Sequence, residues 1–597
     1  MLGAILALRG KEADISKFLL FGAVCGIMAQ MAAACLAGIL NMTGAGPAAR
    51  ILMAAACIVM LLGAAVWRTW RGGRMPKINI SAYDAGSLLV VMLLGVTLHA
   101  GMRELPRTYF NGATDQYYWF AYAERAAHDP AIITSLFMRD SIQQPVFFLL
   151  LDPYVSFMPK DFAAYQEFIK LWQYGAYLLS AFAVARLAAA VLPLKAWGLL
   201  APLLMYALHW LNYYMISTDV VPQNIGIFLL IMGFLLLESE VSATAGVAFI
   251  AIFYFVHVAT CAIFILSVGV GKILTEGMRI FPALWRKKRY QGSWHIFETI
   301  SFVPTIAVIA TYGLYGSGVL KYYPAHLIAY FDEYAKNLTI WDQPYMGTAQ
   351  NAIIWLALCG LALIPFVAAR DLKRRRIMIA AGCGFLLPLV FLRTPIIAYH
   401  AFYASWQSFR YFPVMYPSMA VLALVPLATI AAMIAKKTSR GLAHAITAAC
   451  LIFSIPIGLT LAHAEQKLII LDMITGRDEG ALAEALTARL KKLLSISAEF
   501  PKGAVLTAGM EMHPYPQWAF APRPWLIATG PCSAHDCPTY DAFTHAESQI
   551  WDAPKIGLGI IRKGMPGEAG ARAGFESIFF SRHDDGEYEI YADPRPI

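Results

Sequence analysis

Charged residues are scarce in this chain of 597 residues, where Asp, Glu, Lys and Arg make up 14%. Soluble domains carry about 25% charged and roughly 45–50% apolar residues, whereas hydrophobic residues reach 59% here. This scarcity excludes an ordinary soluble protein. The repeated apolar runs have the length of membrane-spanning helices, about 20 residues each. The sequence therefore predicts a polytopic α-helical membrane protein.

Several common functional motifs are also missing. We find no phosphate loop, nucleophile elbow, CxxC or HExxH in a suitable context. No internal repeat is evident, which disfavours transporters built from inverted halves. The net charge of +9 does not indicate nucleic-acid binding, because the basic residues stand in short loops between apolar runs. The first apolar run lacks a small-residue cleavage site, so we expect it to remain as an anchor.

The basic loops give the predicted topology. RTWRGGRMPK at 68–77 and RDLKRRR at 370–376 are typical of cytoplasmic loops, because Lys and Arg accumulate on that side. The charge pattern is consistent with about 13 spans, a cytoplasmic N-terminus and external loops at 103–167, 317–349 and 393–413. The predicted spans are 18–40, 48–67, 84–101, 168–191, 196–216, 223–238, two within 243–272, 297–316, 350–369, 377–392, 415–435 and 441–462.

The apolar block 243–272 is too long for one span and short for two. His257 stands at its middle. We interpret the block as a pair of helices that enters the membrane, turns near His257 and returns. This arrangement puts the basic residues 286–289 on the cytoplasmic side, as the charge rule requires.

The chain divides into three predicted parts: an N-terminal hairpin with its cytoplasmic loop (1–83), a transmembrane core (84–463) and an external C-terminal domain (464–597). In the last part DEGALAEALTARLKKLL has the spacing of an amphipathic helix. KGAVLTAG, PWLIATG, IGLGIIRKG, ESIFFSR and EYEIYAD are predicted strands, bounded by Gly, Pro and Asp. About 130 residues suffice for a small α/β domain.

Asp115 is the strongest catalytic candidate. It follows the third predicted span and precedes Gln116, Tyr117, Tyr118 and Trp119. A carboxylate at a membrane interface can take a proton from an acceptor hydroxyl, and it could also hold a divalent cation through its oxygens. The structural alternative is a helix cap, because Thr114 and Asp115 stand before a helical stretch.

Arg410 is the second candidate, in SFRYFP at the external mouth of a span. An arginine there can bind a phosphate or pyrophosphate in fork geometry, or it can snorkel to lipid headgroups beside the aromatic belt. His257 is more often a structural histidine than a ligand, and Lys321 gives a weaker signal. Aromatic residues such as Tyr345 either belong to the interfacial belt or stack on a sugar or an isoprenoid.

Two cysteines stand apart from the other seven, which lie in apolar runs. Cys532 and Cys537 lie in the polar segment PCSAHDCP. In an external, oxidising compartment they would form a local disulfide. Free thiols are the alternative, and a zinc site with His535 would need a spacing that is not a standard one. We therefore predict no metal site here.

The third span followed by TDQYYWFAYAERAAHDPAI and then QQPVFFLLL resembles the first external loop of GT-C glycosyltransferases. The likeness is to the protein O-mannosyltransferase and aminoarabinose-lipid A transferase branch. Asp115 matches the acidic motif, Tyr122-Ala123-Glu124 the following helix, and Gln144-Pro145-Val146-Phe147 the proline segment. The block around His257 resembles paired short helices of that fold, and Arg410-Tyr411 an Arg-Tyr feature before a late span. The resemblance covers the architecture of residues 84–597.

The resemblance implies transfer of a sugar from a polyprenyl-phosphate donor to an acceptor hydroxyl at the external face, with inversion. Asp115 would be the general base. Arg410, with Lys321 or His257, would stabilise the leaving phosphate, and Tyr118, Tyr345 and Tyr411 would complete the substrate-binding set. The family usually shows a pair of acids, whereas Gln116 follows Asp115 here, so a divalent cation stays open. The partners would be the lipid donor and a glycan, lipid or protein acceptor.

Two other functions fit a membrane protein of this kind. A lipid-linked saccharide flippase or transporter is disfavoured by the large external domain and by the lack of repeats and of charged mid-span residues. An O-antigen polymerase or ligase is disfavoured by the early Asp115 motif. For the favoured function, the expected location is the bacterial inner membrane, with the C-terminal domain in the periplasm.

Overall fold

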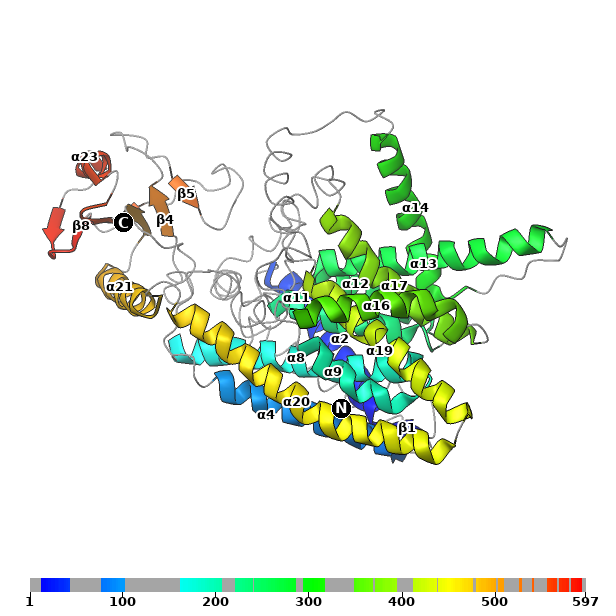
Figure 1. The fold of residues 1–597 in the computed structure, drawn as a ribbon. Helices are drawn as coiled ribbons and strands as arrows, with labels where there is room; N and C mark the ends of the chain where they lie inside the picture. Colours follow the sequence, from blue (N-terminus) through cyan, green and yellow to red (C-terminus); the bar gives the residue numbers. More distant parts are fainter. Residues whose placement is uncertain are drawn as a thin grey trace.

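The computed structural model describes residues 12–42, 77–102, 162–206, 221–239, 241–285, 294–316, 348–368, 371–393, 412–437, 439–475, 479–500, 503–508, 525–528, 539–541, 556–565, 568–578 and 581–592. Most of these residues are helical, and a small sheet lies near the C-terminus (Figure 1). Ahead of the bundle, the short strands β1 (Glu12–Asp14) and β2 (Lys77–Asn79) pair in parallel.

The apolar runs form the helices. They are α2 (Ile15–Met42), α4 (Ala82–Met102), α8 (Phe162–Val191), the 3-10 turn η1 (Lys195–Leu200), α9 (Ala201–Tyr206), α11 (Val221–Leu236), α12 (Ala243–Val256), α13 (Val258–Trp285), α14 (Ile296–Gly316), α16 (Thr348–Val367), α17 (Leu372–Arg393), α19 (Phe412–Lys437) and α20 (Arg440–Thr475). Each predicted span coincides with a helix wherever its residues are described. The predicted span 48–67 lies outside the described residues.

Four of these helices are long and apolar enough to cross a membrane, at Leu171–Val191, Val258–Glu276, Pro413–Lys437 and His444–Ala464. Large apolar side chains also remain uncovered on α4, α14 and α20, for example Met92, Val303 and Phe453. Contiguous apolar surface of this kind needs an apolar surrounding. The chain is therefore a helical membrane protein, while the count of 13 spans and the orientation stay predictions.

The structure confirms two helices with a turn at His257 in the block 243–272, and α13 continues to Trp285. The passage of the pair through the membrane stays a prediction. Ser242 caps α12 through its hydroxyl, which accepts the Ala245 N–H at 3.3 Å. After the break at His257 the chain turns back, so that Cys261 Sγ lies 3.8 Å from the Ile250 carbonyl oxygen. The rings of Phe249 and Phe264 are 6.3 Å apart. With 14 residues, α12 is about 21 Å long at 1.5 Å per residue.

Small residues allow the helices to approach closely, as is common in membranes. At Gly360 in α16 an added Cβ would lie 2.0 Å from the carbonyl oxygen of Leu422 in α19. The α16–α19 pair therefore depends on a position without a side chain.

The longest helix, α20, leads from the bundle toward the C-terminal elements and lies beside α4 (Figure 1). Its 36 residues give it a length of about 54 Å. The predicted domain boundary at 464 falls inside this helix, so the chain leaves the predicted span without a break. The domain boundaries themselves stay predictions.

The C-terminal sheet has the strand order β5-β4-β3-β6-β8-β7. Its strands are β3 (Ala504–Ala508), β4 (Trp525–Ala528), β5 (Thr539–Asp541), β6 (Ile556–Arg562), β7 (Ser581–Asp584) and β8 (Tyr588–Ala592). β3 pairs in parallel with β4 and β6, and the outer pairings are antiparallel. The sequence correctly predicted strands here.

Helices cover both faces of this sheet at β8, all of whose residues are buried. On one face Lys492 of α21 (Glu479–Glu499) lies over the Tyr588 ring. On the other face Phe575 of α23 (Glu568–Ile578) contacts the ring of Tyr591 at 5.5 Å. Because successive side chains of a strand point to opposite faces, Tyr588 and Tyr591 belong to different layers. The amphipathic helix predicted from DEGALAEALTARLKKLL is α21.

The prediction of a strand at ESIFFSR is wrong in its first half. Residues 576–578 end α23, and β7 begins only at Ser581. Ala571 and Phe575, four residues apart, are both buried and form the apolar face of a helix. The helix continues to Ile578, although IFF by itself has the composition of a strand.

We predict that Gly360→Ala lowers the thermal stability of the protein, because its Cβ would collide with the Leu422 backbone. Overpacking of this kind costs about 1–3 kcal/mol. Thermal unfolding of the purified chain in detergent measures the effect. Gly175→Ala is the matched control, since nothing lies within 4 Å of its added Cβ. Equal melting temperatures for the two variants would contradict the close contact.

Candidate functional site

His257 is the predicted site residue that the structure describes. It separates α12 from α13 with an extended backbone (φ −158°, ψ 95°). Its Nδ1 accepts the Thr260 N–H at 3.3 Å, and the Thr260 hydroxyl lies 2.6 Å from the same nitrogen. The imidazole thereby caps the start of α13, as a side-chain acceptor does at an N-cap.

This contact assigns the tautomer of His257. A nitrogen that accepts a backbone N–H carries no proton, so a neutral imidazole holds its proton on Nε2. The Thr260 hydroxyl then donates to Nδ1 as well. The structural role considered for His257 is thus present.

Buried uncharged polar side chains lie at about the level of His257 along the bundle. This layer, called the His257 layer below, consists of His257, Thr260, Gln223 and Asn224, each at most 3% exposed. Gly226 of α11 lies against His257, where an added Cβ would be 2.9 Å from the histidine Cβ. The first turn of α11 is therefore at the level of the α12–α13 turn.

A second contact fixes the direction of α11. Gly233 lies against Phe264, where an added Cβ would be 2.5 Å from the ring. Gly226 and Gly233 are seven residues apart, as are His257 and Phe264, so α11 and α13 run in parallel. The N-termini of both helices lie at the His257 layer.

Asn224 differs from its neighbours in the layer. Its side chain is 3% exposed, and within the described part of the chain neither Nδ2 nor Oδ1 has a hydrogen-bond partner. An unsatisfied buried polar group costs about 1–3 kcal/mol. Such a residue in a helix of a membrane protein is a candidate for ligand contact.

A second polar group lies farther along α13 and consists of two cations and two carboxylates. Lys272 Nζ lies 2.5 Å from Glu276 Oε1 and 3.3 Å from Glu298 Oε2. The other oxygen of Glu298 accepts from Arg376 Nε at 2.7 Å. The four formal charges cancel, which is the condition under which buried charges are tolerated.

The same group joins several helices. Lys272 belongs to α13 and Arg376 to α17, while Glu298 stands in the first turn of α14 and accepts the His295 N–H at 2.8 Å. His295 Nε2 reaches the Ser239 carbonyl oxygen at 2.8 Å. Lys272 also lies 4.4 Å from the centre of the Trp294 ring. This arrangement ties the starts of α14 and α17 to the middle of α13, which is a structural role.

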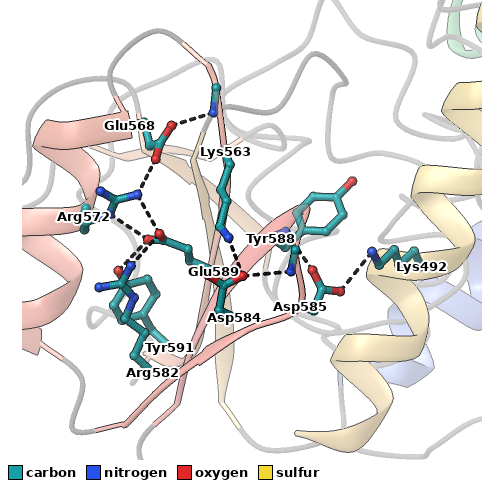
Figure 2. Close-up of polar contacts among 12 residues, drawn as sticks. Lys492, Lys563, Glu568, Arg572, Arg582, Asp584, Asp585, Tyr588, Glu589 and Tyr591 are labelled. Atoms are coloured by element: carbon teal, nitrogen blue, oxygen red, sulfur yellow. Dashed lines mark hydrogen bonds and ion pairs between the residues drawn. The ribbon is translucent and has the colours of Figure 1, made fainter.

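A third polar cluster lies in the C-terminal sheet (Figure 2). Glu589 of β8 is buried and accepts hydrogen bonds from Arg572 of α23 at 2.6 and 2.9 Å. Arg582 of β7 and the Tyr591 hydroxyl bind the same carboxylate at 2.6 and 2.9 Å. Burial raises the pKa of Glu589, but the hydrogen bonds from Arg572, Tyr591 and Arg582 outweigh it, and the net shift is downward.

Salt bridges also hold α21 against the turn between β7 and β8. Lys492 lies 3.0 Å from Asp585 and 3.6 Å from Glu587 (Figure 2). Arg489 reaches Glu587 at 3.7 Å. These pairs are partly exposed and contribute little individually, so the apolar contacts of α21 with the sheet provide most of its attachment.

The other predicted site residues lie outside the described residues. They are Asp115, Tyr118, Lys321, Tyr345, Arg410, Tyr411, Cys532 and Cys537. Their roles, and the predicted disulfide, therefore stay predictions. Among the residues that the structure does describe, no group of three His, Cys, Asp or Glu side chains could hold a metal ion.

Sequence reasoning missed the polar residues of the His257 layer other than His257 itself. Gln223 and Asn224 end the polar stretch STDVVPQN and begin the predicted span 223–238, so their position in the sequence gave no signal of burial. Lys272 ends the predicted helix pair and Glu298 begins a predicted span. Charged residues at span ends usually face the interface, and this pattern concealed their mutual pairing.

We predict that Glu298→Gln destabilises the protein by about 3–5 kcal/mol, because it leaves buried cations without their counter-charge. Thermal unfolding in detergent provides the measurement. Glu238→Gln, in the turn after α11, is a control at a less buried carboxylate and should change stability by less than about 0.5 kcal/mol. A melting temperature unchanged by Glu298→Gln would show that the ion group does not hold the helices together.

The lowered pKa of Glu589 predicts a pH dependence. Because the folded pKa lies below the ordinary value of 4.5, the stabilisation is complete above that value and is lost as pH falls through the folded pKa. At pH 7 the C-terminal region of Glu589→Gln should therefore become sensitive to proteolysis at a lower temperature than that of the unsubstituted chain. The difference should shrink below pH 4.5. A difference independent of pH would refute this interpretation.

Comparison with known proteins adds no family to this geometry. Neither models of known protein families nor curated protein sequences match the chain. The functional argument therefore depends on the buried polar residues described above and on the resemblance in the loop that follows α4.

Proposed function

We propose that this protein is a membrane glycosyltransferase that transfers a sugar from a polyprenyl-phosphate donor to an acceptor hydroxyl. The observation that supports it most is the His257 layer. It is an uncharged polar layer, buried at the start of α11 and α13 in a bundle whose core is mostly apolar. A lipid-linked sugar has matching parts, because its polar head needs buried hydrogen-bonding groups and its tail needs an apolar surrounding.

The proposed chemistry begins with Asp115. Its carboxylate, ionised at neutral pH, accepts the proton of the acceptor hydroxyl as that oxygen forms a bond to the anomeric carbon. The bond between the anomeric carbon and the phosphate oxygen breaks on the opposite face, so the configuration inverts. The electron pair leaves with the polyprenyl phosphate.

The leaving phosphate gains negative charge in the transition state. We assign its stabilisation to Arg410, with Lys321 or His257 as a further contributor, since electrostatic stabilisation is often the largest catalytic contribution. Tyr118, Tyr345 and Tyr411 would stack on the sugar or the isoprenoid. A divalent cation at Asp115 is compatible with this scheme but is not needed for it.

The C-terminal sheet would lie on the external side and contribute to holding the acceptor. Its attachment through the continuous helix α20 supports a stable position relative to the bundle, since α20 runs on to Thr475 without interruption. In this proposal the protein lies in the bacterial inner membrane, with a cytoplasmic N-terminus and the C-terminal domain in the periplasm.

Asp115→Asn tests the proposal. Loss of the general base should reduce transfer by at least about 100-fold. The protein is incubated with each member of a panel of polyprenyl-phosphate sugars, and mass spectrometry measures the polyprenyl phosphate that is released. This product reports turnover whichever sugar is used. Asp129→Asn, in the same loop, is the matched control and should retain activity. Normal turnover by Asp115→Asn would exclude the assigned mechanism.

A further inference from the structure

Asn224 indicates how the protein holds the lipid-linked sugar donor, an inference that depends on the proposed function. Its side chain is buried, with no partner for either polar atom in the described part of the chain. An amide in this state loses its hydrogen bonds to water and gains none in return. The structure therefore contains a group that is prepared for a ligand with both an acceptor and a donor.

Helix geometry gives the direction of this side chain. Asn224 stands in the first turn of the 16-residue helix α11. Side chains in a helix tilt toward its N-terminus, so the amide points toward the start of α11. With 3.6 residues per turn, Asn224 is on the side of α11 away from Gly226, which faces His257.

The start of α11 favours an anion. The first N–H groups of any helix have no acceptor within the helix, and the helix dipole places positive potential there. Phosphate groups bind such positions for both reasons. The whole first turn is buried from Val221 to Asn224, so bulk water does not compete for its donors. Pro222 has no N–H, and the donors therefore come from the other residues of the turn.

The charges of the bundle agree with this assignment. Lys272 follows His257 by 15 residues, which places it about 22 Å along α13 from the His257 layer. Glu276 lies farther along the same helix, and Glu298 contacts Lys272. These two carboxylates are paired with cations at that distance, so they do not oppose an anion at the start of α11.

We propose that Asn224 and the first turn of α11 form the subsite for the phosphosugar head of the lipid donor. The Asn224 Nδ2 and the helix N–H groups donate to phosphate oxygens, while Oδ1 accepts from a sugar hydroxyl. This subsite lies within the bundle and complements the positive charge that Arg410 supplies in the proposed mechanism. Binding of the lipid donor then depends on residues other than the catalytic base Asp115.

The test measures binding of polyprenyl phosphate to the full chain in detergent, with the uncharged polyprenol as the comparison ligand. Asn224→Leu keeps a similar volume and removes both hydrogen-bonding groups. Because hydrogen bonds to charged groups are among the stronger ones, we expect at least about 10-fold weaker binding of the phosphate. Binding of polyprenol should not change. Without ligand the melting temperature should stay equal or rise, since an unsatisfied amide is removed.

Two further variants keep the test decisive. Asn224→Asp retains the shape and adds a negative charge, so it should also weaken binding of polyprenyl phosphate and leave polyprenol unaffected. Ser301→Ala in α14 removes a buried hydroxyl that has no partner within the described residues, and it should bind like the unsubstituted chain. The Asn224→Asp result identifies a phosphate effect even if Asn224→Leu alters packing.

Each other outcome overturns a defined part of the argument. If the unsubstituted chain binds the phosphate and Asn224→Leu binds it equally well, the subsite is wrong and the proposed function stands. Equal weakening for phosphate and polyprenol, or a lowered melting temperature with unchanged affinity, assigns Asn224 to packing or to an internal water. If the unsubstituted chain does not bind polyprenyl phosphate, the proposed donor is wrong as well.

Discussion

The carboxylate of Glu298 is the point at which the helical bundle is held together. It receives Lys272 from α13, Arg376 from α17 and the His295 N–H ahead of α14. Charged groups in an apolar bundle are costly unless they are paired, and a pair that loses one member leaves an uncompensated charge. The interaction therefore fixes the relative positions of three helices, α13, α14 and α17.

The start of α13, at His257, differs from the middle of the helix at Lys272. At the start the polar groups carry no formal charge, and His257 caps the helix with its ring nitrogen instead of entering an ion pair. Membrane proteins commonly keep intramembrane polar residues for function. A bundle that is locked by charges at one level and lined by neutral polar groups at another can stay rigid while it accommodates a lipid headgroup. This division of roles is the physical basis of the proposed enzyme.

The C-terminal sheet follows the same rule. Glu589 is buried on β8, yet two arginines and Tyr591 satisfy it. The layers of the sheet also explain why the predicted strand begins at Glu576, whereas β7 begins at Ser581. The strand composition of IFF competes with the apolar face formed by Ala571 and Phe575, and packing against Tyr591 favours the helix. Tertiary contact decides such cases, because local preference differs little between helix and strand for short apolar runs.

The helices could be predicted from the sequence, because the length of an apolar run is a local property. The turn at His257, the amphipathic helix α21 and most strands of the sheet were predictable for the same reason. Which polar residues meet depends on the packing of the helices. Glu298 and Arg376 are 78 positions apart, and no periodicity links them. From the sequence, Asn224 is the end of a polar loop, whereas in the structure it is buried. Local patterns specify elements, whereas pairing and burial depend on how those elements pack.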